Sequence, residues 1–236
     1  SGRAVWIPDW QIWNSEVGHM TIGCWRVIPQ SIVKIDDLLD ENKFQNLPAF
    51  VAWINHVVKN NSTLHLFTLF GPGWVHSSDT HLEKILKIIP ENVKVSLHLF
   101  GDGRDIEPKS MLELYKNFEK NILSQYKNVR VSSISWRYFW MDRDNNWERI
   151  KLSYDQIVSK TNITNLSVDK YIENEYASWK TDEFITPAFF ENGLNVENND
   201  WVFFLNFRSD RAKQLTKVFV DFDFDWFERK NFENLY

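Results

Sequence analysis

Short apolar segments alternate with helical segments along most of this chain, and this alternation restricts the fold more than any other feature. Four segments rich in apolar and β-branched residues predict buried strands, at 63–70, 93–100, 129–135 and 201–206. Four stretches with apolar spacing near 3.6 residues predict helices, at 47–59, 79–89, 108–124 (which opens with Pro108) and 145–160. Strands that alternate with helices form βαβ units, so the sequence predicts an α/β fold with a mainly parallel sheet and flanking helices.

A polar segment directly follows each of the four predicted strands: GPGWVHSS, GDGRD, WRYFWMDRD and FRSDRA. In parallel sheets, ligands bind beyond the carboxyl ends of the strands, where such segments meet. Five arginines stand close to aspartates in three of these segments: Arg104, Arg137, Arg143, Arg208 and Arg211. One such pair is commonly a surface ion pair. Because planar guanidinium groups bind phosphate and carboxylate through two hydrogen bonds, the segments together predict one pocket for an anionic ligand.

Charge and composition exclude several classes of protein. The formal net charge of −5 is not the footprint of a nucleic-acid-binding protein. No run of 18 or more apolar residues occurs, so the sequence predicts no membrane-spanning helix. Cys24 is the only cysteine, which excludes internal disulfides and cysteine-built zinc sites and favours a reducing compartment.

Six motifs occur in a fixed order along the chain: NSEVGH with a following IG, GxVHS, DGRD with a following PKS, RYFxMDRDxxWER, TDEF and NFRxDRAxQLT. In this order, they resemble the cofactor-independent phosphoglycerate mutases of the alkaline phosphatase superfamily over essentially all 236 residues. That family has a phosphatase-like domain into which a second α/β domain is inserted. The resemblance implies a fragment that lacks both ends, with a stub of the phosphatase-like domain at 1–30. The inserted substrate-binding domain is expected at 31–236, incomplete at its C-terminal end.

The resemblance also implies roles for individual residues. Ser15 occupies the serine of NSEVGH and is expected to be the phosphate-accepting nucleophile and a metal ligand. Asp105 is expected to accept the proton of the glycerate hydroxyl. The expected substrate-binding residues are His76, Arg104, Asp105, Arg137, Arg143, Arg208 and Arg211.

The implied reaction interconverts 2-phosphoglycerate and 3-phosphoglycerate through a phosphoserine on a two-metal site. Manganese is the expected metal, with magnesium as the alternative, and no organic cofactor is implied. The remaining metal ligands of the family lie outside this chain, so the fragment alone is expected to be inactive. We expect a cytoplasmic monomer whose partner is the small-molecule substrate, with no nucleic acid and no membrane involved. Two alternatives stay open: another phosphomutase or phosphatase of the superfamily, and a non-catalytic phosphoglycerate-binding module.

Tryptophan is unusually frequent, at 12 residues against only 8 glycines. By the family resemblance, ten of these tryptophans stand where relatives have glycine or another small residue: Trp6, Trp10, Trp13, Trp25, Trp74, Trp136, Trp140, Trp179, Trp201 and Trp226. Glycine is selected where φ is positive or where the backbone approaches a ligand closely. We therefore expect glycine at these ten positions in the functional protein. This is the result when UGA codons that specify glycine are translated as tryptophan. Indole rings there are expected to crowd the ligand loops.

Overall fold

The computed structural model describes residues 15–28 and 30–236, with side chains from Gly18 onward. The chain divides into one compact unit that ends at Val51 and a second that spans Ala52–Tyr236. In the first unit lie α1 (Ser15–Cys24), α2 (Ser31–Asp40), η2 (Phe44–Asn46) and the start of α3 (Pro48–Asn60). Phe44 and Phe50 pack edge to face there, with ring centroids 5.7 Å apart. The domain boundary expected at residue 30 stays a prediction.

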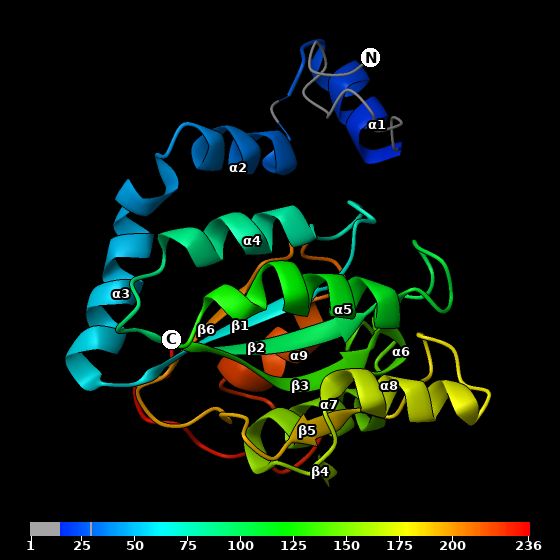
Figure 1. Ribbon diagram of the computed structural model, residues 1–236. Helices are drawn as coiled ribbons and strands as arrows, with labels where there is room; N and C mark the ends of the chain where they lie inside the picture. The colour runs from blue at the N-terminus through cyan, green and yellow to red at the C-terminus, as the bar shows by residue number, and fades with distance from the viewer. Residues whose placement is uncertain (1–14, 29) are drawn as a thin grey trace. The chain divides into compact units, whose positions relative to one another are not determined.

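The second unit is built around a six-stranded sheet with the strand order β4-β5-β3-β2-β1-β6 (Figure 1). Its strands are β1 (Thr63–Leu69), β2 (Lys94–Gly101), β3 (Val129–Trp136), β4 (Ile163–Thr164), β5 (Ala188–Phe190) and β6 (Trp201–Phe204). β1 runs parallel to β2 and β6, and β2 runs parallel to β3. β5 is antiparallel to β3. The α/β fold with a mainly parallel sheet is therefore confirmed, and the four predicted strands are present.

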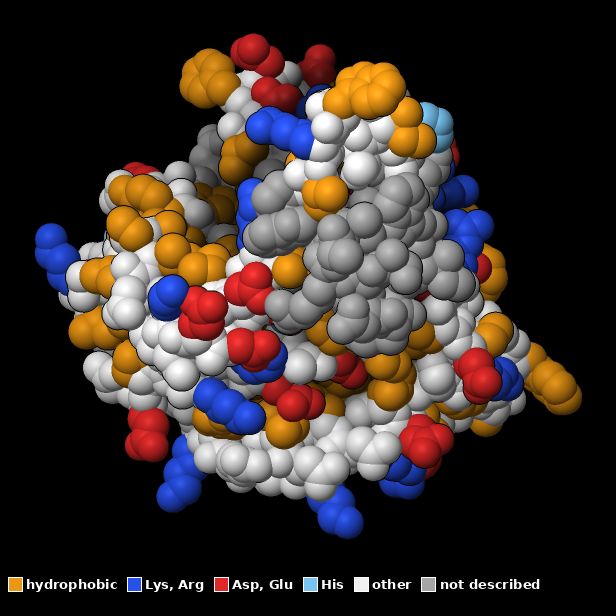
Figure 2. Space-filling model, turned by 90° about the horizontal axis from the view of Figure 1, so that it is seen from above, with side chains coloured by type: hydrophobic (Ala, Val, Ile, Leu, Met, Phe, Trp, Pro, Cys, Tyr) orange, Lys and Arg blue, Asp and Glu red, His pale blue; other side chains and the backbone are white. Residues whose placement is uncertain are grey.

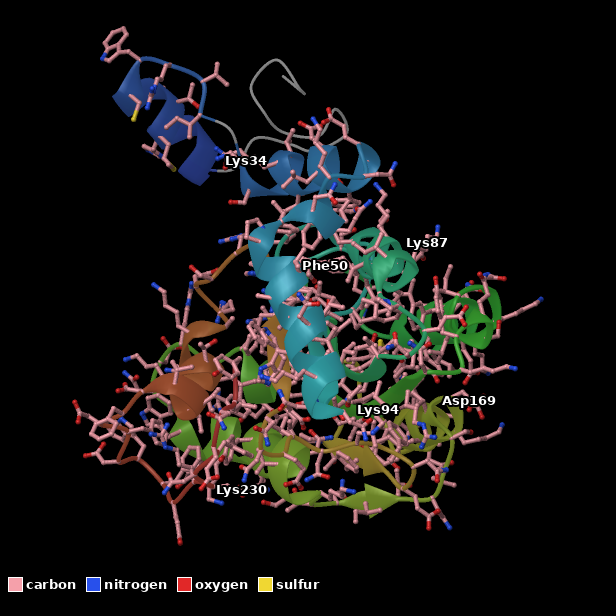
Figure 3. All side chains as sticks on the ribbon, turned by 90° about the vertical axis from the view of Figure 1, so that its left-hand side faces the viewer. Lys34, Phe50, Lys87, Lys94, Asp169 and Lys230 are labelled. Atoms are coloured by element: carbon pink, nitrogen blue, oxygen red, sulfur yellow. The ribbon has the colours of Figure 1, made fainter. Side chains whose placement is uncertain are left out.

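Helices cover both faces of this sheet, α4 and α5 on one face and α7 and α9 on the other (Figure 1). The helices and helical turns of the second unit after α3 are α4 (Asp79–Ile88), α5 (Met111–Asn121), η3 (Leu123–Gln125), α6 (Arg137–Trp140), α7 (Trp147–Ser159), α8 (Val168–Ala177) and α9 (Lys213–Val220). All seven residues of β1 are buried, as expected for a central strand covered on both sides. Side chains fill the space between the sheet and the helices (Figure 3), with Phe70 against Phe118 of α5 and Phe67 against Phe219 of α9.

Two local features differ from the sequence prediction. The helix expected from Pro108 begins at Met111, because a distant carboxylate caps it there. Asp182 accepts hydrogen bonds from the backbone N–H groups of Ser110 (2.9 Å) and Met111 (3.0 Å), which satisfies two donors at the start of α5. The sequence also gave no signal for β4 and β5, which have only two and three residues.

Buried polar side chains in the sheet satisfy one another. Nδ1 of His65 lies 2.9 Å from Nε2 of His98, and Nε2 of His65 lies 3.0 Å from a carboxylate oxygen of Asp200. Nδ1 of His98 lies 2.7 Å from the hydroxyl of Ser133. Burial, reinforced by His65, lowers the pKa of His98 well below its usual value, so this ring is neutral. These contacts account for the burial of two histidines within the sheet.

The surface carries both signs of charge close together. Figure 2 shows Lys and Arg side chains interspersed with Asp and Glu on the visible face. Proteins that bind the phosphate backbone of a nucleic acid instead carry a basic patch or stripe. Among the described residues, we find no helix with the length and apolar character needed to cross a bilayer.

Five of the described tryptophans have environments, of two kinds, that are unusual for this residue type. Trp25, Trp74 and Trp179 have left-handed backbones with φ of 51°, 52° and 62°. Non-glycine side chains are strained there, and bulky ones most of all. Trp136 and Trp140 are fully buried, and their indole N–H groups lack a hydrogen-bond partner among the described residues. Both observations support glycine or another small residue at these positions, whereas Trp6, Trp10 and Trp13 lie outside the described residues.

Trp179→Gly is expected to stabilise the protein by about 1 kcal/mol, because left-handed strain of roughly 1–2 kcal/mol is partly offset by unfolded-chain entropy. Trp179 ends α8 in a glycine-type cap: its N–H bonds the carbonyl of Tyr176 at 3.1 Å, and the N–H of Lys180 bonds that of Glu175 at 3.2 Å. The indole is 90% exposed and adds almost no burial. Urea unfolding measures the effect.

Trp179→Ala is the matched control, because alanine also removes the indole but keeps the strain of a Cβ at positive φ. An equal gain in both variants would show that the indole, and not the backbone conformation, carries the cost.

Candidate functional site

The segments that follow β1, β2, β3 and β6 meet at one edge of the sheet. The N–H of Phe207 bonds the carbonyl of His76 at 2.9 Å, and the side-chain oxygen of Asn206 accepts from the N–H of Leu69 at 3.2 Å. These bonds join the segment after β6 to the segment after β1. Arg137, at the end of β3, bonds Asp102 at the end of β2. The carboxyl ends of these parallel strands thus bring together the four polar segments that the sequence had marked.

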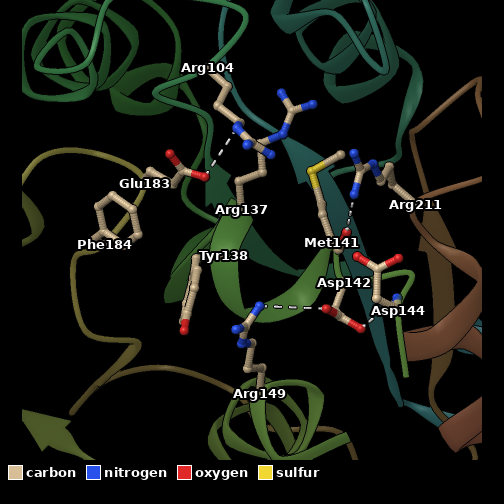
Figure 4. A pocket seen from close by; sticks show the side chains of 10 residues that line it. All are labelled: Arg104, Arg137, Tyr138, Met141, Asp142, Asp144, Arg149, Glu183, Phe184 and Arg211. Carbon is tan, nitrogen blue, oxygen red and sulfur yellow. Dashed lines mark hydrogen bonds and ion pairs between the residues drawn. The ribbon is translucent and has the colours of Figure 1, made fainter. Parts of the chain in front are cut away.

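A cavity of about 360 Å³ opens beside the segments after β2, β3 and β6 (Figure 4). Four arginines and three carboxylates line it: Arg104, Arg137, Arg149, Arg211, Asp142, Asp144 and Glu183. Tyr138 contributes an aromatic wall, and the guanidinium carbon of Arg149 lies 4.0 Å from its ring centroid. Such a cationic, partly enclosed space suits a small polyanionic ligand.

Arg137 is the most deeply held cation of the site, with only 7% of the residue exposed. Its Nη1 donates to Asp102 at 2.6 Å and also to Asp105. Its Nη2 lies 3.4 Å from Nε2 of His76, and its buried Nε has no hydrogen-bond partner among the described residues. Burial alone would lower the pKa of Arg137, but the hydrogen bonds to Asp105 and Asp102 outweigh it and raise this pKa, so the group stays charged.

His76 is buried between two carboxylates, 3.9 Å from Asp105 and 3.7 Å from Asp210. Burial, followed by the charges of Arg208 and Arg137, lowers the pKa of His76 to about 4. The ring is therefore neutral near pH 7 and acts through hydrogen bonds, not through charge. Because its Nε2 faces a donor of Arg137, its proton belongs on Nδ1, on the side of Asp210.

Asp210 faces three nitrogen-bearing side chains from three different loops. Its carboxylate lies 3.6 Å from Nε of Arg208, 3.9 Å from Nη1 of Arg143 and 3.7 Å from His76. Arg211 is held differently, since its Nη1 donates to the carbonyl of Met141 at 3.1 Å. Burial, together with the nearby charges of Arg143 and Arg137, lowers the pKa of Arg211. The cations around this edge repel one another, which favours the binding of an anion between them.

The turn after β2 presents Arg104 at the rim of the cavity. Gly103 in this turn has φ of +69°, and a Cβ there would lie 2.8 Å from the backbone nitrogen of Glu183. A glycine is therefore required. Asp102 accepts hydrogen bonds from the N–H groups of Arg104 and Asp105, both at 3.1 Å. Nε of Arg104 lies 3.2 Å from the carboxylate of Glu183.

The seven substrate-binding residues expected from sequence all lie at this edge, and Arg104, Arg137 and Arg211 line the cavity itself. Ser15 begins α1 in the first unit, and its side chain lies outside the described residues. The roles assigned to these eight residues stay predictions.

Several residues that build the site had no role assigned from sequence: Asp102, Asp210, Glu183, Tyr138 and Arg149. All five stand inside the quoted motifs. Asp102, Asp210 and Tyr138 stand beside arginines in the sequence, but their contacts were not visible there.

Trp136 does not crowd the ligand loops as the sequence suggested. Its indole is buried in the sheet beside Gly101, where an added Cβ would lie 1.9 Å from the ring. Trp140 likewise stacks on Phe100 in the core, with centroids 4.0 Å apart. Trp74 does lie in the loop after β1, where its ring meets His81 at 5.3 Å.

Within the part of the chain that the structure describes, no group of three or more His, Cys, Asp or Glu side chains is arranged to hold a metal ion. Three or more protein ligands are usual for a catalytic divalent metal of the zinc type. The described residues therefore do not form the metal site that the resemblance implies.

Comparisons with known proteins agree with the motifs. The family model described as BPG-independent PGAM N-terminus matches residues 35–236. The 2,3-bisphosphoglycerate-independent phosphoglycerate mutase of Clostridium botulinum (strain ATCC 19397 / Type A) is 41% identical over 243 residues, covering 100% of this chain and 47% of that protein. The enzyme of the same name from Lawsonia intracellularis (strain PHE/MN1-00) is 42% identical, covering 97% of this chain and 45% of that protein.

The fold also matches a crystal structure of Leishmania mexicana phosphoglycerate mutase at low cobalt concentration, with a TM-score of 0.88 and 27% identity. That match covers 99% of this chain and 45% of the other. The chain thus spans about half the length of the relatives it matches.

Proposed function

Since this chain belongs to the N-terminal family of the BPG-independent phosphoglycerate mutases, we propose that its arginine-lined cavity binds phosphoglycerate. The protein that carries it then interconverts 2-phosphoglycerate and 3-phosphoglycerate. The observation that carries the proposal is the convergence of four arginines, from the segments after β2, β3 and β6 and from α7, on one cavity of about 360 Å³, a size suited to a small ligand.

The charge distribution supports a ligand with two anionic groups. Arg137 and Arg104 come from the loops after β3 and β2, whereas Arg208 and Arg211 come from the loop after β6. A phosphate and a carboxylate on one small molecule can each engage a separate guanidinium group. Asp105 shares Arg137 with Asp102 and is the more exposed of the two carboxylates, at 22% against 4% of the side chain. We assign to Asp105 the role of accepting the proton of the glycerate hydroxyl.

The proposed chemistry has two phosphoryl transfers with no net change in phosphate. The phosphoryl group leaves one hydroxyl oxygen of glycerate and bonds to the Ser15 oxygen, and the departing oxygen regains a proton. Glycerate stays bound, reorients, and takes the group back on its other hydroxyl. The arginines stabilise the charge that develops on the transferring group.

A divalent metal pair, with manganese expected, belongs to this proposal as the source of charge stabilisation and nucleophile activation. The described residues form no site for it, so we derive no step through a metal. The domain assignment, with 1–30 phosphatase-like and 31–236 substrate-binding, belongs to the same proposal. So does a cytoplasmic monomer that acts on a small molecule.

This chain alone is expected to bind 3-phosphoglycerate but to show no turnover with added manganese. Binding needs only the cavity of the second unit, while turnover needs metal ligands that the described residues do not supply. Calorimetry measures binding, and an assay of 2-phosphoglycerate formation measures turnover.

Glycerol 3-phosphate, which lacks the carboxylate, and glycerate, which lacks the phosphate, are the control ligands and should each bind at least about tenfold more weakly. Equal binding of all three would indicate an unspecific anion site. Turnover by the chain alone would contradict our account of the metal.

A further inference from the structure

We propose that Asp102 is a positioning residue for this site: it fixes the guanidinium group of Arg137 and the turn that presents Arg104 and Asp105. The inference rests on the proposed function, which supplies the ligand. Asp102 is the first residue after β2, and it is buried, with 3% of its surface exposed. It does not line the cavity and acts through its neighbours.

Three donors converge on one oxygen of Asp102. Oδ1 accepts from the backbone N–H groups of Arg104 and Asp105, both at 3.1 Å, and from Nη1 of Arg137 at 2.6 Å. The first two bonds close the turn, and the third is a charge-assisted bond to a buried guanidinium group. One side chain therefore couples the loop after β2 to the end of β3.

This arrangement determines which edge of Arg137 is left for a ligand. Nη1 is occupied by Asp102 and Asp105, so the group is held by one corner. The opposite edge carries Nε, which has no partner among the described residues, and Nη2, whose contact with His76 is long at 3.4 Å. Nε and Nη2 form the two-donor edge that binds a phosphate or carboxylate through parallel hydrogen bonds. Arg137 lines the cavity, where such an anion would enter (Figure 4).

Asp102 and Asp105 both contact Arg137 but differ in their exposure to solvent. The side chain of Asp102 is 4% exposed against 22% for Asp105, although both contact the same nitrogen of Arg137. The inner carboxylate holds the cation, which leaves the outer one accessible to the ligand. Without Asp102, Asp105 would be the one carboxylate left on Nη1 of Arg137, and the group proposed for proton transfer would hold the cation alone.

Asp102→Asn in the complete protein tests this inference, because an amide oxygen can still accept the two backbone N–H groups while the charge that holds Arg137 is lost. We expect kcat/KM for 3-phosphoglycerate to fall at least tenfold and its dissociation constant to rise. The same substitution in an Arg137→Lys background should lower kcat/KM less than threefold, since the partner through which Asp102 acts is already changed.

Asp200→Asn is the matched control. Asp200 is also buried, at 4% exposed, and accepts two backbone N–H groups, from Thr63 at 2.7 Å and Glu197 at 2.8 Å. It also contacts His65, but it precedes β6 and so lies at the other end of the sheet. We expect this variant to lower the unfolding temperature and to leave the dissociation constant within twofold of the parent.

The outcomes separate the inference from the function on which it rests. A parent protein that neither binds nor converts 3-phosphoglycerate overturns both. An active parent with an unchanged Asp102→Asn variant overturns the positioning role alone. Equal losses in the parent and Arg137→Lys backgrounds also overturn it, because Asp102 would then act independently of Arg137.

Discussion

Arg137→Lys in the complete protein is expected to lower kcat/KM for phosphoglycerate at least about a hundredfold, or roughly 3 kcal/mol of transition-state stabilisation. Lysine keeps the charge but replaces a planar fork with a single ammonium group. One ammonium cannot reach Asp102 and Asp105 on one side while offering two parallel donors to a ligand on the other. Steady-state kinetics in both reaction directions measure the loss.

Lysine substitutions at two other arginines serve as comparisons for Arg137→Lys. Arg208→Lys should cost less, because Arg208 is 36% exposed and lies 3.6 Å from Asp210 without a hydrogen bond. Arg130→Lys should change the kinetics less than twofold, since Arg130 is exposed on β3, away from the cavity, and its Nη1 donates to the carbonyl of Asn192 at 3.3 Å. Unchanged kinetics for Arg137→Lys would mean that its contacts with the two aspartates are purely structural.

Ser15→Ala is expected to reduce interconversion of the two phosphoglycerates by more than about a thousandfold while leaving 3-phosphoglycerate binding within a fewfold of the parent. The reason is that the serine carries the phosphate between the two hydroxyls, whereas the arginines of the second unit hold the ligand. Turnover and calorimetric binding, measured on the complete protein, separate the two effects.

Thr21→Ala provides the control for this variant, because it removes another hydroxyl from α1 without touching the expected nucleophile. Its activity should stay within a fewfold of the parent. If Ser15→Ala retained activity within tenfold, the assignment of the nucleophile would be wrong.

The main elements of the fold were determined by local sequence pattern. The apolar run at 63–70 becomes β1, and its central position follows from the absence of charged residues that would need water on either face. The period of α4, α5 and α7 was equally clear, because each buries one apolar face against the sheet. The first residue of α5 could not be predicted, because the residue that caps it, Asp182, lies in a loop about 70 residues later.

The edge at which the site forms could also be predicted, because the carboxyl ends of parallel strands always meet on the same side. This rule predicts that His76, Arg137 and Arg208 lie near one another. The pattern did not reveal their contacts. Asp102 and Asp210 both stand inside motifs with arginines. Nothing in the local sequence indicates that Asp102 binds Arg137 at 2.6 Å whereas Asp210 lies 3.6 Å from Arg208.

The sequence by itself determined the α/β class, the polar segment after each of four strands and the excess of tryptophan over glycine. Only the tertiary structure decided what each tryptophan does. Trp179 ends a helix with a positive φ and an exposed ring, whereas Trp136 is buried in the sheet beside Gly101. The physical reason is that strain at a helix end depends on hydrogen bonds to the preceding turn, while burial depends on strands that are distant in sequence.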